Sequence, residues 1–151
     1  MKRSILSFAF GAALLLTGAA AAQTTPAATA LPDLKGTWVG KGESIVDGPA
    51  GHHPPGVTAK AAGTYRLREE TFTVRIEGQE GRRVWGNISS SQRVGERLIG
   101  SIAADNKAVY FVSGEGYIDG VVVDANTMDI CYRHVLPGSA VVACNQWVRQ
   151  K

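Results

Sequence analysis

Histidines are the first residues to consider for chemistry in this chain, because imidazole binds metals and exchanges protons near neutral pH. His52, His53 and His134 are the only three. His52 and His53 lie in a segment rich in Gly and Pro, where two imidazoles have the freedom to reach a metal ion. Adjacent side chains of an extended segment point apart, however, and that segment has no carboxylate beyond Asp47. We therefore expect a solvated loop and no metal site.

Motifs for covalent catalysis and for phosphate binding are missing from the sequence. There is no Gly-x-Ser-x-Gly elbow, no phosphate-binding loop, and no pair of metal ligands on one strand. These patterns are how the common hydrolases and nucleotide-binding enzymes position a nucleophile or a phosphate. We therefore expect a protein that is not an enzyme and that uses no cofactor.

Two carboxylates lie within apolar strand candidates. Asp119 interrupts the apolar segment 117–123, and Glu43 follows two glycines in the segment 35–46. Such a residue either faces outward and is solvated, or faces inward and is paired, in which case it orients a bound molecule. We favour the solvated alternative for Asp119, and we keep this residue as a candidate for ligand binding.

Cys131 and Cys144 are the only cysteines, and we expect them to form a disulfide. Residues that face each other in an antiparallel hairpin have sequence numbers with a constant sum. A Cys131–Cys144 pair therefore centres the hairpin between Pro137 and Gly138, which are the best turn residues of the segment. Facing residues lie about 4.5 to 5.5 Å apart at Cα, a distance that a disulfide spans.

The elements that must position these residues are short strands. Turn signals recur at close spacing, centred near Gln79, Arg93, Asn106, Glu115, Ala125 and Pro137-Gly138. No helical pattern separates them, which is typical of an all-β meander. We predict eight strands, at 35–46, 64–76, 82–90, 96–103, 107–113, 117–123, 127–134 and 140–149. Eight strands allow an antiparallel up-and-down sheet to close as a barrel.

The faces of these strands are harder to predict. In segment 64–76 the apolar residues are first odd-numbered, at Tyr65 and Leu67, and then even-numbered, from Phe72 onward. We interpret this change as a one-residue bulge within 68–71. Several other strands are apolar at both parities, so the sequence leaves their inward faces open.

The segment Gly36-Thr37-Trp38 resembles the Gly-x-Trp signature that opens barrels of the calycin superfamily, which includes the lipocalins and the avidin-like proteins. In that family the Trp closes one end of the barrel, and an Arg late in the last strand packs across its ring. Arg149 lies where such an Arg is expected. The resemblance implies a Trp38–Arg149 plug and does not imply biotin binding. Another small barrel or a β-sandwich stays open as an alternative.

The N-terminus has the pattern of a secretory signal peptide. Basic residues at 2–3 precede an apolar run at 5–16 and small residues at 18–22, so we expect cleavage after Ala22 and a signal peptide at 1–22. Segment 23–33 is rich in Ala, Thr and Pro, which predicts a flexible leader. Residues 34–151 then form a single β-barrel domain. The expected location is periplasmic or secreted.

Charge and hydropathy exclude two classes of partner. The net charge of +3 includes Lys2 and Arg3, and it falls to +1 when they leave with the signal peptide. Within the remaining chain the longest basic block is Arg82-Arg83, so we expect no binding to nucleic acid. No apolar stretch reaches the roughly 20 residues of a membrane-spanning helix, so we expect no membrane span.

The aromatic residues point to a pocket. They include Trp38, Tyr65, Phe72, Trp85, Tyr110, Phe111, Tyr117, Tyr132 and Trp147. We expect most to be core residues, and we choose as ligand-binding candidates Trp38, Tyr65, Trp85, Tyr110, Tyr117 and Asp119. Segment 47–56, the longest predicted loop, is a plausible lid.

The leading hypothesis is an exported barrel, monomeric or weakly oligomeric, that binds a small apolar or amphipathic molecule in its interior. The alternatives are a protein-binding module, such as an inhibitor of a secreted hydrolase, and a structural protein of the cell envelope. A ligand-binding protein needs an unfilled interior, whereas an inhibitor can have a packed one.

Overall fold

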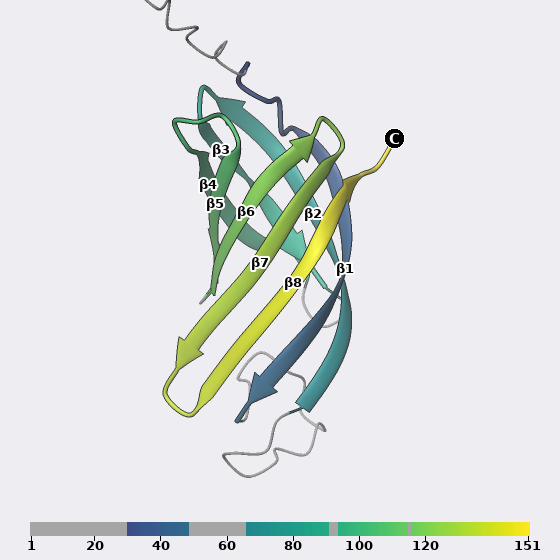
Figure 1. The fold of residues 1–151 in the computed structure, drawn as a ribbon, viewed down its shortest axis with the longest axis vertical. Helices are drawn as coiled ribbons and strands as arrows, with labels where there is room; N and C mark the ends of the chain where they lie inside the picture. The colour runs from purple at the N-terminus through teal and green to yellow at the C-terminus, as the bar shows by residue number, and fades with distance from the viewer. Residues whose placement is uncertain (1–29, 49–65, 91–93, 115) are drawn as a thin grey trace, which may run out of the picture.

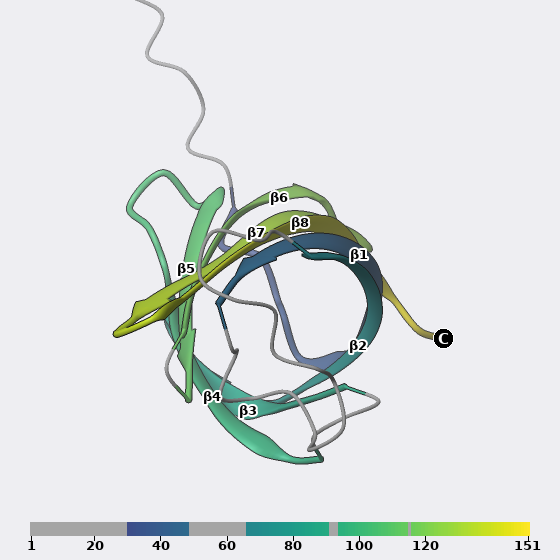
Figure 2. The same ribbon diagram turned by 90° about the horizontal axis from the view of Figure 1, so that it is seen from below.

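The computed structural model describes residues 30–48, 66–90, 94–114 and 116–151. These residues form an all-β structure of eight strands that close as a barrel (Figures 1 and 2). The strands are β1 (Gly36–Asp47), β2 (Arg66–Glu80), β3 (Arg83–Ser89), β4 (Glu96–Ile102), β5 (Ala108–Ser113), β6 (Gly116–Asp124), β7 (Thr127–Leu136) and β8 (Ser139–Arg149). Among the described residues, no helix is long and apolar enough to cross a membrane.

Each strand pairs antiparallel with the next one in sequence, and β1 pairs with β8 to close the ring. The predicted up-and-down topology is therefore confirmed, and so are all eight strands. The first turn was placed too early, because β2 continues to Glu80 and the turn lies at residues 81–82. The C-terminal hairpin has the predicted register, with Cys131 opposite Cys144 and Leu136 opposite Ser139.

The Cys131–Cys144 disulfide is present, and its Cα atoms are 4.1 Å apart. Both cysteines belong to the outward-facing parity of their strands, and Cys144 is exposed. The bond therefore joins β7 to β8 on the outside of the barrel and takes no space from its interior. Closing a loop of this length stabilises a protein by roughly 3 kcal/mol in the chain-entropy model.

The bulge predicted within residues 68–71 is absent. β2 pairs with β1 in one continuous register, from Ile76 opposite Gly36 to Arg66 opposite Val46. The irregularity of β2 lies instead between Ile76 and Gly78, in its pairing with β3.

The continuous register reverses the expected faces at the start of β2. Leu67, which we expected inside the barrel, is 84% exposed. The even-numbered residues Arg66, Arg68 and Glu70 share the inward parity of Phe72. The prediction failed because it assigned charged residues to solvent and apolar residues to the interior. In β2 the strand geometry overrides that preference, so charged side chains enter the barrel.

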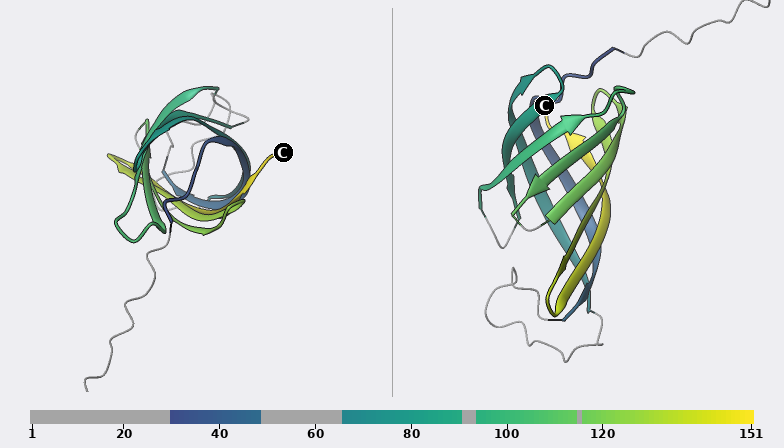
Figure 3. Two further views of the ribbon diagram at one scale, coloured as in Figure 1. Left: turned by 90° about the horizontal axis from the view of Figure 1, so that it is seen from above. Right: turned by 90° about the vertical axis from the view of Figure 1, so that its left-hand side faces the viewer.

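One end of the barrel is filled with apolar side chains. At the end of the barrel where β1 begins, Leu34 and the inward-facing residues of the strands form a single buried cluster. Its members are Leu34, Trp38, Val74, Ile76, Val84, Leu98, Ile102, Val109, Phe111, Ile118, Met128, Ile130 and Trp147. Residues 30–35 approach β1 at this end, which is also the end where the chain finishes (Figures 1 and 3). We call it the capped end, and we call the opposite end, where β7 turns into β8, the hairpin end.

Trp38 and Arg149 form the closure that the family resemblance implies. Trp38 is fully buried, and the Arg149 guanidinium carbon lies 4.2 Å from the centre of its ring. The Trp38 Nε1 atom donates a hydrogen bond to the Leu34 carbonyl at 2.9 Å. Arg149 also donates to the carbonyls of Asp33 and Ala125, so one side chain joins β8 to the approach segment and to the β6–β7 turn.

The approach segment has a second tether to the sheet. Leu34 donates its backbone N–H to Gln79 Oε1 at 2.8 Å, and Gln79 Nε2 donates to the Pro32 carbonyl at 2.9 Å. Gln79 lies near the end of β2, so these bonds hold the segment over the capped end. The predicted signal peptide and residues 23–29 of the predicted leader lie outside the described residues. The leader was predicted to extend to residue 33, but Pro32 and Asp33 accept hydrogen bonds from Gln79 and Arg149, so the end of that segment is attached to the barrel.

Candidate functional site

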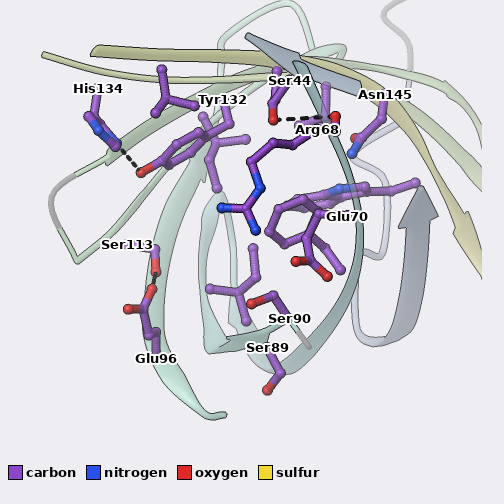
Figure 4. Close-up of a pocket in the computed structure, with 17 residues that line it drawn as sticks. Ser44, Arg68, Glu70, Ser89, Ser90, Glu96, Ser113, Tyr132, His134 and Asn145 are labelled. Carbon is purple, nitrogen blue, oxygen red and sulfur yellow. Dashed lines mark hydrogen bonds between the residues drawn. The ribbon is translucent and has the colours of Figure 1, made fainter. Parts of the chain in front are cut away.

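The hairpin half of the barrel contains a cavity of about 130 Å³. Its apolar walls are Phe72, Ile88, Ile118, Ile130, Val141, Ala143 and Trp147. Its polar lining residues are Ser44, Arg68, Glu70, Ser89, Ser90, Glu96, Ser113, Tyr132, His134 and Asn145 (Figure 4). A barrel of eight strands either fills its interior with side chains or holds one small ligand. In this barrel the capped half is filled with side chains, and the hairpin half contains the cavity.

The strand register explains why these polar residues share one space. Ser44 of β1 lies opposite Arg68 on one side and opposite Ala143 of β8 on the other. Ala143 in turn lies opposite Tyr132 of β7. Since directly paired residues point to the same face, the side chains of these four residues form one row inside the barrel. The row runs across the four long strands β2, β1, β8 and β7.

Tyr132 and His134 form a polar contact in the wall of the cavity. The Tyr132 hydroxyl and His134 Nδ1 are 2.7 Å apart, and the two rings meet edge to face (Figure 4). His134 is only 3% exposed. A Cβ atom at Gly116 would lie 1.9 Å from a ring carbon of Tyr132, so the glycine that begins β6 leaves the space that this ring occupies.

The short strands supply the facing wall. Glu96 begins β4, Ser113 ends β5, and the Ser113 hydroxyl donates to Glu96 Oε2 at 3.4 Å (Figure 4). Glu70 extends into the same space from β2. Glu70 and Glu96 each have a further interaction partner. The cavity thus contains carboxylates that are already engaged.

Two arginines of β2, Arg66 and Arg68, differ from these carboxylates. Arg66 donates one hydrogen bond to the Gly48 carbonyl, and its Nε atom is buried without a partner. Arg68 extends into the cavity, and its Nη1 atom is also buried without a partner (Figure 4). A guanidinium has five N–H donors, so both side chains keep unused donors, and of the two only Arg68 lines the cavity.

Most of the predicted ligand-binding residues lie elsewhere. Trp85, Tyr110 and Tyr117 are 45%, 53% and 63% exposed on the outer surface, so they do not line the cavity. They were chosen because aromatic rings are frequent in pockets, but the buried, inward-facing residues next to them in sequence are aliphatic residues, glycines and Phe111. Trp38 is inside the barrel but belongs to the apolar plug. Tyr65 lies outside the described residues.

The predicted carboxylates also face outward. Asp119 faces outward, as the favoured alternative expects, but it is not simply solvated, because it forms an ion pair with Arg133 of β7 and is only partly exposed. Glu43 is exposed on the outer face of β1. The candidate lid 47–56 is described only at Asp47 and Gly48, and His52 and His53 lie outside the described residues. Within the described ranges, no three metal-binding side chains cluster together.

Sequence reasoning missed the polar side chains of β2, β4 and β7 that enter the cavity. One signal was present. Arg66, Arg68 and Glu70 have the same parity as Phe72, Val74 and Ile76, so an uninterrupted strand of period two places them all on one face. We had expected aromatic rings to form the walls, and among these Phe72, Tyr132 and Trp147 do line the cavity.

The groups with shifted pKa values, Lys41, Glu69 and Asp105, lie on the outer surface of the protein. A hydrogen bond and the charge of Glu69 raise the pKa of Lys41, and Lys41 lowers the pKa of Glu69 in the same way. Backbone N–H groups of Lys107 and Ala108 lower the pKa of the Asp105 carboxyl in the β4–β5 turn. Neither group of residues lines the cavity.

Comparison of the chain with known proteins identified no similar protein. No protein-family profile matches the chain, and neither the curated proteins nor the solved structures contain a detectable match. The closed eight-stranded barrel is compatible with a calycin-like fold. Membership of that superfamily therefore stays a resemblance, carried by the Gly36-Thr37-Trp38 segment and Arg149.

Proposed function

We propose that this protein is an exported small-molecule-binding protein, acting by binding and not by catalysis, as a monomer or weak oligomer. One observation carries the proposal. The interior is close-packed at the capped end, yet it contains a cavity of about 130 Å³ with both apolar and polar walls at the hairpin end. Polar side chains turned into a barrel lose hydration, and a bound molecule that contacts them recovers part of that loss.

Two observations support the export part of the proposal. The first 22 residues have the composition of a signal peptide. The Cys131–Cys144 disulfide is typical of proteins in oxidising compartments. The mass of the purified protein tests both together, because cleavage after Ala22 and disulfide formation each change the mass of the chain by a known amount.

Native mass spectrometry of protein purified from the exported fraction tests ligand binding. We expect extra mass on the native protein that disappears when the sample is denatured. Ala143→Phe places a ring in the cavity wall and should abolish the extra mass. Val142→Phe changes the next residue of β8, which is 48% exposed, and serves as the matched control. Equal ligand occupancy in both variants would place the ligand elsewhere.

A second candidate function is protein binding, and the outer surface supports it. Trp85 lies opposite Ile99, Ile99 opposite Val112, and Val112 opposite Tyr117. All four are exposed, so they form a row of apolar side chains across β3, β4, β5 and β6. A contiguous exposed row of this kind is typical of a partner surface. Replacement of the four exposed residues by serines should leave small-molecule binding unchanged, and this separates protein binding at the outer surface from ligand binding in the cavity.

A further inference from the structure

Arg68 is the cavity residue with the most unusual environment. Its guanidinium lies in the middle of the cavity, between Tyr132 on one side and Glu70 on the other (Figure 4). The Nη1 atom is buried and has no hydrogen-bond partner. None of the ion pairs found between described residues includes Arg68. Arginine does not lose its proton in proteins, so this position holds an incompletely paired positive charge.

A buried, unpaired donor of a charged group is unfavourable, and an anion that reaches it recovers the lost interaction. The guanidinium fork suits planar anions with two oxygens, because two parallel N–H···O bonds then form. A carboxylate meets this requirement. The geometry of Arg68 therefore favours an anionic group on the bound molecule.

The other charged groups of the cavity do not remove this preference. Glu70 and Glu96 face the same space, but each has its own interaction partner, and Glu96 accepts the Ser113 hydroxyl. His134 is bonded to the Tyr132 hydroxyl. Arg66 adds a second positive charge one row nearer the hairpin end. The selectivity arises from the unused donors of Arg68 and not from a strongly positive cavity.

The apolar walls define the rest of the ligand. Phe72, Trp147 and Ile130 lie deeper than Arg68, toward the apolar core, so the anionic group faces the hairpin end and the apolar part faces the capped end. The volume sets the size. An engineered cavity of about 150 Å³ in another protein binds benzene, so about 130 Å³ suits one small ring.

From these observations we propose that the cavity selects a small anionic molecule with an apolar part of about the size of a benzene ring, and that Arg68 binds its anionic group. The proposal rests on the proposed function and narrows it to a class of arene carboxylates and acids of similar shape. It assigns Arg68 as the residue that determines specificity. It also predicts that a neutral molecule of the same shape binds more weakly.

Titration calorimetry with benzoate and benzamide tests the proposal, because the two probes have nearly the same shape and differ in charge. The full exported protein should bind benzoate about 10- to 100-fold more tightly than benzamide, the range expected for hydrogen bonds to a charged group. In Arg68→Met this ratio should fall to about one. Arg97→Met, which removes an exposed arginine from the outer face of β4, should keep the wild-type ratio.

A second variant protects the test against misfolding. Arg68→Lys keeps the charge and loses the planar fork, so it should retain a preference for benzoate at reduced affinity. Circular dichroism and the unfolding midpoint show whether each variant is folded. Equal affinities for the two probes in the wild-type protein overturn the proposal, and so does an unchanged ratio in folded Arg68→Met.

The result is separable from the proposed function. If benzamide binds as well as benzoate, and Ala143→Phe blocks both, the cavity binds small molecules without charge selection. In that case the proposed function stands and the role of Arg68 is wrong. If neither probe binds, the anionic-ring proposal is overturned, while native mass spectrometry of the purified protein still decides whether another small molecule occupies the barrel.

Discussion

The two halves of the barrel interior are built by the same strands and differ in residue type. At the capped end the inward positions of β1, β2 and β7 are Trp38, Val74 and Met128, and all three are fully buried. Nearer the hairpin end, the inward positions of β2 and β7 are Arg68 and His134. The alternation of inward and outward residues continues through both halves.

This difference separates stability from binding within one small domain. Burial of apolar side chains contributes most of the favourable free energy of folding, and the large apolar cluster lies at the capped end. Buried polar groups oppose folding unless they are paired. Arg68, which keeps an unpaired donor inside the barrel, therefore lowers stability at the hairpin end, and the cavity there is the feature that this arrangement creates.

Trp38→Ala should have the largest effect, because it removes the plug of the capped half. We expect a loss of about 3–5 kcal/mol in the free energy of unfolding, measured by denaturant titration. Trp85→Ala is the matched control, since the Trp85 ring is 45% exposed on the outer surface. It should cost about 1 kcal/mol or less. Equal losses in the two variants would contradict the assignment of stability to the capped end.

The double substitution Cys131→Ala with Cys144→Ala tests the hairpin half. Removing the disulfide should lower the free energy of unfolding by roughly 3 kcal/mol. Because the bond lies outside the barrel, the cavity volume should be unaffected. The wild-type protein in reducing buffer should show the same loss as the double variant. Free thiols in non-reducing peptide mapping of the exported protein would contradict the pairing.

Two glycines of β1 allow a finer comparison. A Cβ atom at Gly40 would lie 2.5 Å from the Trp147 indole and 2.9 Å from the backbone oxygen of Gln146. At Gly42 it would meet only the side chain of Asn145, at 2.5 Å. Gly40→Ala should therefore cost about 1–3 kcal/mol, and Gly42→Ala about 1 kcal/mol or less, because an asparagine beside a cavity has room to move.

Unfolding midpoints of the two alanine variants measure this difference directly. A larger loss for Gly42→Ala than for Gly40→Ala would show that the hairpin half is packed as rigidly as the capped half. In that case the description of the interior as one filled half and one open half would be wrong.

Asp105 should give the smallest effect, because it lies in an exposed turn at the capped end. Its carboxylate accepts the N–H groups of Lys107 and Ala108, which lowers its pKa in the folded protein. A lowered folded-state pKa stabilises the protein above the ordinary Asp value of about 4, and the contribution is lost as the pH falls through the folded-state pKa. Asp105→Asn should abolish that pH dependence.

Stability measured between about pH 7 and pH 2 checks this prediction. The difference between the wild type and Asp105→Asn should be constant above about pH 5 and should shrink at lower pH. A difference that grows on acidification would contradict the sign of the pKa shift. The Lys41–Glu69 pair on the outer surface is unaffected by the substitution and remains as an internal reference.

The C-terminal hairpin could be predicted from four residues. Two cysteines and the Pro137-Gly138 turn fix one register, because the sequence numbers of facing residues have a constant sum. The strands and their order were also predictable, since turn residues mark the ends of each strand. Local chemistry determines these features, so a single sequence is enough to find them.

The cavity could not be predicted in the same way. Arg68 and Glu70 have the hydropathy of solvent-exposed residues, and hydropathy alone cannot distinguish a residue that lines a polar cavity from a residue that faces solvent. Their position is set by the register of β2 against β1, which depends on contacts distant in sequence. The outer-surface residues Trp85, Tyr110 and Tyr117 were misplaced for the converse reason, because apolar residues occupy both faces of their strands.

The contacts of Arg149 have a consequence for how the protein is made. This side chain bonds to the carbonyl of Asp33, a residue 116 positions earlier, and β8 must pair with β1 before the barrel closes. Folding that depends on pairing between the two ends of a chain is slow, because the entropy cost of bringing the ends together must be met before their contacts form. The barrel therefore cannot close before β8 has been synthesised. Late closure of the barrel is compatible with the export that we propose.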